Sequence, residues 1–275
     1  MRRRSPVEHV RAEWNQRSGE LGLLPPQGGV EPTEYAPLTC FKHKELGLDR
    51  ETLLQARPTI AVIGGTGELG SALAKRWAAA GYPIVLGSRS KQKAQAAAQE
   101  MNANDGSVTG DDNRAAAAAA DIVVIAVPYA SHEAIINEIK PAVAGKIVVD
   151  TVVPLVPPKV SVVKLPPDGS AALIAQRLLG EAARVQSAFH NVSASKLHSG
   201  GSVDCDVLVF GDDREARAAV IDLANAAGAR GLDGGPLANS AAAEALTSVL
   251  IGINRRYKID GAGIRITGLP AAQRR

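Results

Sequence analysis

A glycine-rich loop follows the first apolar run of the chain and has the residue types that a phosphate-binding turn needs. It reads, in order, Gly64, Gly65, Thr66, Gly67, Glu68, Leu69 and Gly70. From its second residue it matches the spacing G-x-G-x-x-G, in which the glycines permit a tight turn, close approach of a pyrophosphate, and packing of a helix on a strand. The sequence therefore predicts a dinucleotide site at a helix N-terminus, whose free N–H groups attract phosphate. The alternative, an ordinary strand–turn–helix connection with glycines for geometry alone, stays open.

The residues that follow the second predicted strand favour NADP over NAD. NAD enzymes place an Asp or Glu about 20 residues beyond the loop, where it binds the ribose 2′-hydroxyl. Here Ser88 and Arg89 occupy that place, Lys93 follows, and no carboxylate occurs between them. Ser88 can donate a hydrogen bond to a 2′-phosphate, Arg89 can bind it with two N–H groups, and Lys93 can add charge one helical turn later. The alternative is that Arg89 and Lys93 belong to a solvated helix start.

These residues lie in a chain whose predicted strands and helices alternate, which is typical of a doubly wound parallel sheet. We expect strands at 59–63, 83–86, 121–127, 146–150, 160–165, 185–189 and 206–210. We expect helices at 68–80, 91–101, 111–120, 132–140, 170–179, 213–227 and 240–256, and a glycine-rich loop at 231–236. The predicted fold class is α/β, a Rossmann-type NADP-binding domain with a smaller C-terminal α/β region.

The pattern also predicts three parts. Residues 1–57 are rich in proline, glycine and mixed charge, and we expect an N-terminal extension with short helices at Val7–Arg17 and Arg50–Gln55. Residues 58–183 form the expected NADP-binding domain, and 184–275 the smaller C-terminal region. The role of the extension, a solvated segment or a partner-docking one, stays open.

Composition excludes several other classes of protein. A chain of 275 residues with 45% hydrophobic residues can bury a core without disulfides. The 31 basic and 28 acidic residues are too balanced for a nucleic-acid binder. Cys40 and Cys205 form no paired motif, the basic start at Met1 lacks an apolar segment after it, and no run of about 20 apolar residues occurs. We therefore expect a cytoplasmic protein that binds small molecules, with no membrane or nucleic-acid partner.

The chain lacks the motifs of several catalytic sites. No H-E-x-x-H or C-x-x-C occurs, and His190 and His198 are not spaced as a helical pair, so we expect no metal. No G-x-S-x-G occurs either. His190 follows a predicted strand and is the one candidate for a chemical role, as a hydrogen-bonding group or proton donor. The alternative for His190 is a structural histidine at a strand end.

Beyond single motifs, the region from Thr59 to Gly268 resembles the NADP oxidoreductases that depend on coenzyme F-420, an 8-hydroxy-5-deazaflavin. The segments that carry the resemblance are IAVIGGTGELG, LGSRSKQKA, AVPY, VVDTVVPL, QSAFHN, VFGDD and GPLANS. The resemblance implies an enzyme that transfers hydride between nicotinamide C4 and deazaflavin C5. Family members have the glycine loop at the N-terminus, whereas about 57 residues precede it here.

The resemblance also implies which residues contact each cofactor. Thr66, Ser88, Arg89 and Lys93 would hold NADP, and Val127 and Pro128 would line the nicotinamide side. The deazaflavin pocket would be formed by Val153, Pro154, Leu155, His190, Asn191, Pro236 and Leu237. Because members are often dimeric, a homodimer is expected.

Two other functions remain open. The chain could be an NADP-dependent reductase of another small imine or keto substrate, because one fold serves many reactions. It could also be a non-catalytic NADP-binding sensor with the N-terminal extension as its docking segment.

Overall fold

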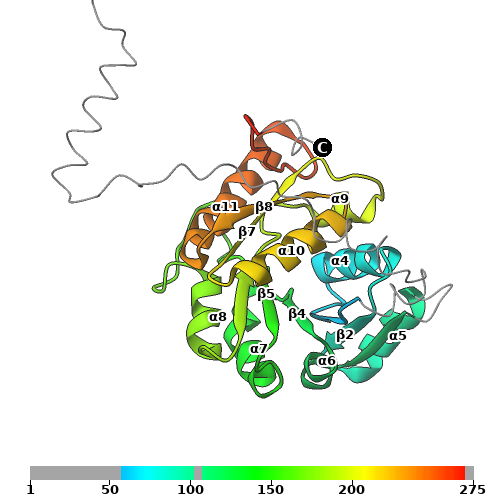
Figure 1. Ribbon diagram of the computed structural model, residues 1–275. Coiled ribbons are helices and arrows are strands. Elements are labelled where there is room, and N and C mark those ends of the chain that lie inside the picture. Colours follow the sequence, from blue (N-terminus) through cyan, green and yellow to red (C-terminus); the bar gives the residue numbers. More distant parts are fainter. Residues whose placement is uncertain (1–56, 102–106, 270–275) are drawn as a thin grey trace, which may run out of the picture. The chain divides into compact units, whose positions relative to one another are not determined.

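The computed structural model describes residues 57–101 and 107–269. The helices expected at Val7–Arg17 and Arg50–Gln55, and all of the expected N-terminal extension except its last residue, lie outside the described residues. Elements are numbered as in Figure 1.

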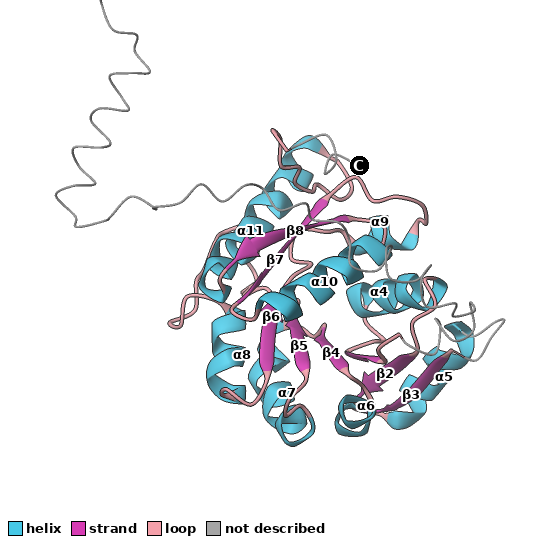
Figure 2. Ribbon diagram, in the orientation of Figure 1, coloured by secondary structure: helices cyan, strands magenta, loops and turns pink. Residues whose placement is uncertain are grey.

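Eight strands of the described residues form a single sheet in the order β3-β2-β1-β4-β5-β6-β7-β8 (Figure 2). Their bounds are β1 Ile60–Ile63, β2 Ile84–Ser88, β3 Val108–Asp112, β4 Ile122–Ile125, β5 Ile147–Asp150, β6 Arg184–Ser187, β7 Asp206–Gly211 and β8 Arg230–Gly235. Neighbouring strands are parallel except β6 and β7, which pair antiparallel. The doubly wound α/β fold is thus confirmed, with one antiparallel pair in the sheet.

Helices connect the strands and cover the sheet (Figure 1). Apolar residues from strands and helices form two core clusters. Their bounds are α4 Glu68–Ala79, α5 Lys91–Met101, α6 Asn113–Ala119, α7 His132–Ile139, α8 Ala171–Leu179, α9 Ala194–His198, α10 Arg214–Ala226 and α11 Ser240–Tyr257. Helices α4, α5, α9 and α10 supply one cluster, and α6, α7 and α8 supply the other. Three 3-10 turns, Tyr129–Ser131, Lys140–Ala142 and Leu237–Asn239, complete the described elements.

Sequence and local structure agree where apolar runs are long and caps are clear. Ser170 begins α8 as expected, because its Oγ accepts a hydrogen bond from the backbone N–H of Leu173 at 3.1 Å. Asp213 caps α10 in the same way through Ala216, at 3.0 Å. Trp77 of α4 fills the centre of one cluster, where it contacts Phe189 edge-on and donates to the carbonyl of Leu223.

Both edges of the sheet depart from the prediction. The helix expected at 111–120 is wrong at its start, because Asp111 and Asp112 end β3 and α6 begins at Asn113. The loop expected at 231–236 is largely β8. Glycines explain both errors: a Cβ at Gly110 would come 2.3 Å from the backbone of α5, and one at Gly231 would come 2.7 Å from that of α10. A glycine in a strand weakens the apolar pattern but permits such close packing.

Two further differences concern the region after β5. The strand expected at 160–165 is wrong, because residues 155–169 form an irregular loop with short turns, in which Val162, Val163 and Leu165 are exposed. Helix α9, only five residues long, was not predicted. Both segments are short and show no clear hydrophobic periodicity, so their sequence does not distinguish strand, helix and loop.

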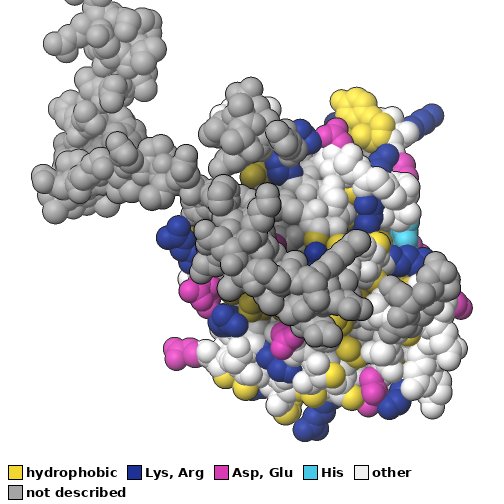
Figure 3. Space-filling view, turned by 45° about the vertical axis from the view of Figure 1, so that its right-hand side comes forward, with side chains coloured by type: hydrophobic (Ala, Val, Ile, Leu, Met, Phe, Trp, Pro, Cys, Tyr) yellow, Lys and Arg dark blue, Asp and Glu magenta, His cyan; other side chains and the backbone are white. Residues whose placement is uncertain are grey.

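Within the described residues, no helix is long and apolar enough to cross a membrane. Figure 3 shows Lys, Arg, Asp and Glu side chains interspersed over the visible part of the described surface. This distribution agrees with the near balance of charge in the sequence.

Candidate NADP and deazaflavin site

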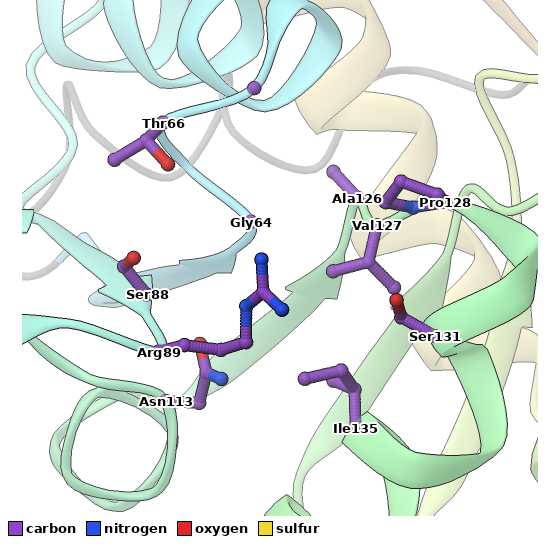
Figure 4. A pocket seen from close by; sticks show the side chains of 11 residues that line it. Gly64, Thr66, Ser88, Arg89, Asn113, Ala126, Val127, Pro128, Ser131 and Ile135 are labelled. Carbon is purple, nitrogen blue, oxygen red and sulfur yellow. The ribbon is translucent and has the colours of Figure 1, made fainter.

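A cleft of about 210 Å³ lies at the carboxyl ends of β1, β2 and β4, where open α/β sheets bind their ligands (Figure 4). The residues that line it come from the glycine loop, the end of β2, the start of α6 and the segment from β4 to α7. They are Gly64, Thr66, Gly67, Ser88, Arg89, Asn113, Ala126, Val127, Pro128, Ser131 and Ile135. Seven of the twelve residues predicted to contact NADP are among them.

The glycine loop is packed so closely that a Cβ would collide with the backbone at three of its positions, Gly64, Gly65 and Gly70. Gly64 has φ +84°, and a Cβ there would lie 2.4 Å from the carbonyl oxygen of Ala126. A Cβ on Gly70 would lie 2.5 Å from the carbonyl oxygen of Gly64. The loop is thereby held between β4 and the first turn of α4, with Gly67 as the N-cap of that helix.

The other predicted loop residues lie behind or beside the cleft. Gly65 is buried and donates its N–H to the carbonyl of Val62 at 3.0 Å. Glu68 and Leu69 begin α4, and the carbonyl of Glu68 lies 3.2 Å from Nε2 of His198. These residues therefore build the loop rather than line the cleft.

Ser88 and Arg89 place a hydroxyl and a cation on one wall of the cleft. Figure 4 shows the guanidinium of Arg89 extending into it from the end of β2. Among the described residues, no carboxylate forms an ion pair with Arg89. Lys93 is exposed on α5 and does not line the cleft. Arg89 is thus the cation positioned to meet an anionic ligand there.

Two carboxylates near this wall were missed in the sequence, because they follow a strand that was not predicted. The pairing of β2 with β3 places Asp111 beside Gly87 and Asp112 beside Ser88. Each has a local partner: Lys91 Nζ lies 3.0 Å from Asp111, and Asp112 Oδ1 accepts from the N–H of Ala115 at 2.8 Å. The hydrogen bond from Lys91 lowers the pKa of Asp111. These contacts reduce the repulsion that either carboxylate would exert on a phosphate.

The opposite wall of the cleft is apolar. Val127 and Pro128, both predicted, follow β4, and Ile135 of α7, which was not predicted, is 6% exposed beside them. Val127 also contacts the glycine loop, since its Cγ1 would lie 2.9 Å from a Cβ on Gly64. The cleft therefore has a polar wall at β2 and an apolar wall at β4.

The residues predicted to bind the deazaflavin follow three strands: Val153, Pro154 and Leu155 come after β5, His190 and Asn191 after β6, and Pro236 and Leu237 after β8. The segment with Val153, Pro154 and Leu155 is tied to the end of β4, because the N–H of Thr151 donates to the carbonyl of Ile125 at 3.1 Å. The sheet order thus brings this segment beside the apolar wall.

Helix α11 holds the second predicted group in place. Asn191 Nδ2 donates to the carbonyl of Ala243 at 2.9 Å, and Thr247 Oγ1 donates to the carbonyl of His190 at 2.9 Å. Pro236 is exposed, whereas the side chain of Leu237 is 1% exposed and packs in the core. Leu237 can therefore shape this region only by supporting its neighbours.

His190 is buried and uncharged. Its Nε2 lies 3.0 Å from Ser187 Oγ, and 7% of the residue is exposed. Burial lowers the pKa of His190 to about 4, and the nearby Asp150 offsets this only in part. An imidazole in this state can give or accept a hydrogen bond at neutral pH but carries no surplus proton.

Near His190 lies a buried polar cluster that was not predicted from the sequence: His132, Asp150 and Glu244. His132 Nε2 is 2.6 Å from Asp150 Oδ2, and both side chains are inaccessible to solvent. Burial lowers the pKa of His132, but the hydrogen bond and charge of Asp150 outweigh it, so the net shift is upward. Glu244 accepts N–H hydrogen bonds from Ala171 and Ala172 at the start of α8, and burial raises its pKa to about 7. In the sequence, the one sign of this cluster was Asp150, a carboxylate at the end of the apolar strand β5.

Among the residues that the structure describes, no group of three or more His, Cys, Asp or Glu side chains is arranged to hold a metal ion. The site consists of hydrogen-bonding groups, one cation and apolar walls. Such an arrangement can bind and orient two flat cofactors and exclude water.

Known proteins resemble this chain in sequence and in fold. Residues 59–154 match the family model described as NADP oxidoreductase coenzyme F420-dependent. The F420-dependent NADP reductase of Methanocaldococcus jannaschii is 42% identical over an alignment of 221 residues, and the match covers 76% of this chain and 98% of the relative. The reductase of the same name from Methanothermobacter marburgensis is 40% identical over an alignment of 222 residues, and the match covers 77% of this chain and 99% of the relative.

A solved structure agrees with these relatives. The protein assigned as an F420-dependent NADP-reductase from Arthrobacter sp. FB24 superposes with a TM-score of 0.65 at 27% identity. The match covers 76% of this chain and 99% of that protein.

Proposed function

The chain belongs to the family of coenzyme F-420-dependent NADP oxidoreductases, and we propose that it binds NADP in the cleft at the ends of β1, β2 and β4. It is an NADPH:coenzyme F-420 oxidoreductase, an enzyme that transfers hydride between NADP(H) and the deazaflavin. The observation that supports this site best is the convergence of the glycine loop with Ser88 and Arg89 in one cleft.

The residues of this cleft fit NADP. The first turn of α4 begins at the loop, so its N–H groups suit the pyrophosphate. Arg89 and the hydroxyl of Ser88 suit the 2′-phosphate, since a guanidinium binds phosphate with two N–H groups. Val127 and Pro128 give the nicotinamide an apolar surface from which water is excluded.

The proposed deazaflavin half of the site is the C-terminal region from residue 184, together with Val153, Pro154 and Leu155. The two bound cofactors supply the chemistry, because hydride passes between nicotinamide C4 and deazaflavin C5 when these atoms are about 3–3.5 Å apart. The chain orients the rings and shields them. His190 serves this side as a neutral hydrogen-bonding group that orients the ring; its low pKa argues against a role as proton donor. The expected homodimer and cytoplasmic location stay predictions.

The test of the NADP site measures the dissociation constants of NADPH and NADH for the purified chain and for Arg89→Ala. A charge-assisted hydrogen bond contributes about 1.5–3 kcal/mol, so Arg89→Ala should weaken NADPH binding by roughly 10- to 150-fold and leave NADH nearly unchanged. Lys75→Ala, which removes an exposed cation of α4 outside the cleft, is the matched control. Equal loss for NADPH and NADH, or the same loss in the control, would contradict the assignment of Arg89 to the 2′-phosphate.

A further inference from the structure

Asn113, the first residue of α6, has a buried amide oxygen without a partner at the floor of the cleft. The residue is 1% exposed, lines the cleft, and its Oδ1 accepts no hydrogen bond from the described residues. A buried acceptor without a donor costs about 1–3 kcal/mol, and such groups in native proteins commonly meet a ligand or water. Among the described residues that line the cleft, Asn113 is therefore the one with a buried side-chain acceptor that has no hydrogen-bond donor.

The orientation of this amide is fixed by an ionic partner. Asn113 Nδ2 donates to Glu138 Oε2 of α7 at 3.2 Å. A carboxylate accepts hydrogen bonds and does not donate them, so the flipped amide would set two oxygens against each other. Glu138 thereby keeps the nitrogen of Asn113 turned toward α7 and the oxygen turned toward the end of β2, where a Cβ on Gly87 would lie 3.3 Å from it.

The surroundings of the oxygen indicate what could reach it. Figure 4 shows Asn113 below Arg89, with Ile135 facing it across the cleft. If Ser88 and Arg89 hold the 2′-phosphate, the ribose lies above the end of β2 and its base extends between the stem of Arg89 and Ile135. Arg89 is exposed, so its side chain can move away from Asn113 when it turns to the phosphate. An aliphatic stem on one side and Ile135 on the other suit a flat ring.

We propose that Asn113 Oδ1 accepts a hydrogen bond from the exocyclic amine of the adenine of NADP, with Glu138 as the positioning residue that holds the amide in the accepting orientation. This inference rests on the proposed NADP site. Adenine has a single donor group on its ring system, its 6-amine, so an acceptor at the floor of a base slot selects that group. The pair Asn113–Glu138 would make the enzyme selective for adenine over bases with an oxygen at this position.

The test compares the binding of NADPH with that of its reduced hypoxanthine analogue, in which an oxygen replaces the 6-amine, by fluorescence titration without the deazaflavin. A site built to hydrogen-bond a donor discriminates strongly against an analogue without it. We expect the wild-type chain to bind NADPH at least about tenfold more tightly than the analogue, which is the effect of one lost hydrogen bond. Asn113→Leu should bind the two within about threefold, because the acceptor is gone.

Glu138→Ala is the second variant, and it removes an exposed carboxylate rather than a core side chain. The freed amide can turn its NH₂ group toward the base, so the preference for NADPH over the analogue should fall well below the wild-type ratio. Glu133→Ala, which removes another exposed carboxylate of the same helix, should keep the wild-type ratio. Equal binding of both dinucleotides by the wild type, or a preference that survives Asn113→Leu, would overturn the inference. Failure of the wild type to bind NADPH at all would instead refute the proposed function.

Discussion

Two helical glycines give a matched test of how the glycine loop is packed. Gly70 lies in the first turn of α4 and Gly252 in the middle of α11, and neither has a positive φ. Replacing a helical glycine by alanine stabilises a helix by about 1 kcal/mol. At Gly252 the added Cβ would meet only Ser161 Cβ at 3.9 Å, so Gly252→Ala should gain this stability. With about 2–4 °C per kcal/mol for a domain of this size, its Tm should rise by that amount.

Gly70→Ala gains the same helix propensity but creates a collision. Its Cβ would lie 2.5 Å from the carbonyl oxygen of Gly64 and 3.1 Å from both Gly64 C and Gly65 Cα. These are backbone atoms, which cannot rotate away as a side chain can, so α4 and the loop must separate. Overpacking of this kind costs about 1–3 kcal/mol, so Gly70→Ala should be less stable than Gly252→Ala by that amount.

The assay combines thermal unfolding with NADPH titration. Gly70→Ala should melt roughly 2–12 °C below Gly252→Ala, combining the overpacking cost with 2–4 °C per kcal/mol. It should also bind NADPH more weakly than wild type, because the displaced loop no longer matches the pyrophosphate, whereas Gly252→Ala should bind normally. A Gly70→Ala variant as stable as Gly252→Ala, with unchanged NADPH affinity, would show that the close packing of the loop against α4 is not required.

Three further predictions concern the buried polar groups behind the site. The pKa of His190 is lowered from 6.5 to about 4, so the chain should lose stability as pH falls from 6.5 toward 4, because the unfolded chain binds a proton first. His190→Gln should reduce the difference in the free energy of unfolding between pH 7 and pH 5, measured by urea unfolding. The pKa of Glu244 is raised from 4.5 to about 7, so the stability that its protonated form contributes is greatest below pH 4.5 and is lost as pH rises through 7. Glu244→Gln should flatten the dependence of the free energy of unfolding on pH between pH 5 and pH 8. An unchanged pH dependence in this variant would count against the raised pKa of the buried carboxyl. Asp150→Ala leaves His132 buried without its partner and should cost about 3–5 kcal/mol in the free energy of unfolding. A loss under 1 kcal/mol would show that the pair is unimportant for stability.

The sequence predicts well what depends on neighbours along the chain. The glycine loop, the strand before it and the helix after it are contiguous, so one local pattern specifies all three. Arg89 could be identified because its place is defined by distance from that loop. The strands β1, β4 and β5 are buried apolar runs, which leave little choice of structure.

What the sequence could not show depends on contacts between distant segments. Strands β3 and β8 lie at the edges of the sheet and carry glycines because helices pack closely on them, a cause that is invisible before the fold is known. Glu244 meets the start of α8 from 72 and 73 positions away, and Asn113 is oriented by a carboxylate 25 positions away. Such side chains look ordinary in sequence, and only the fold brings their partners to them.

Isotope tracing distinguishes direct hydride transfer between NADPH and the deazaflavin from an indirect route. The purified chain is mixed in ordinary water with oxidised coenzyme F-420 and NADPH that carries deuterium at both positions of nicotinamide C4, and the product is analysed by mass spectrometry. We expect the reduced deazaflavin to carry one deuterium at C5. A reduced deazaflavin without deuterium would contradict direct transfer, and no reduction of the deazaflavin at all would contradict the function itself.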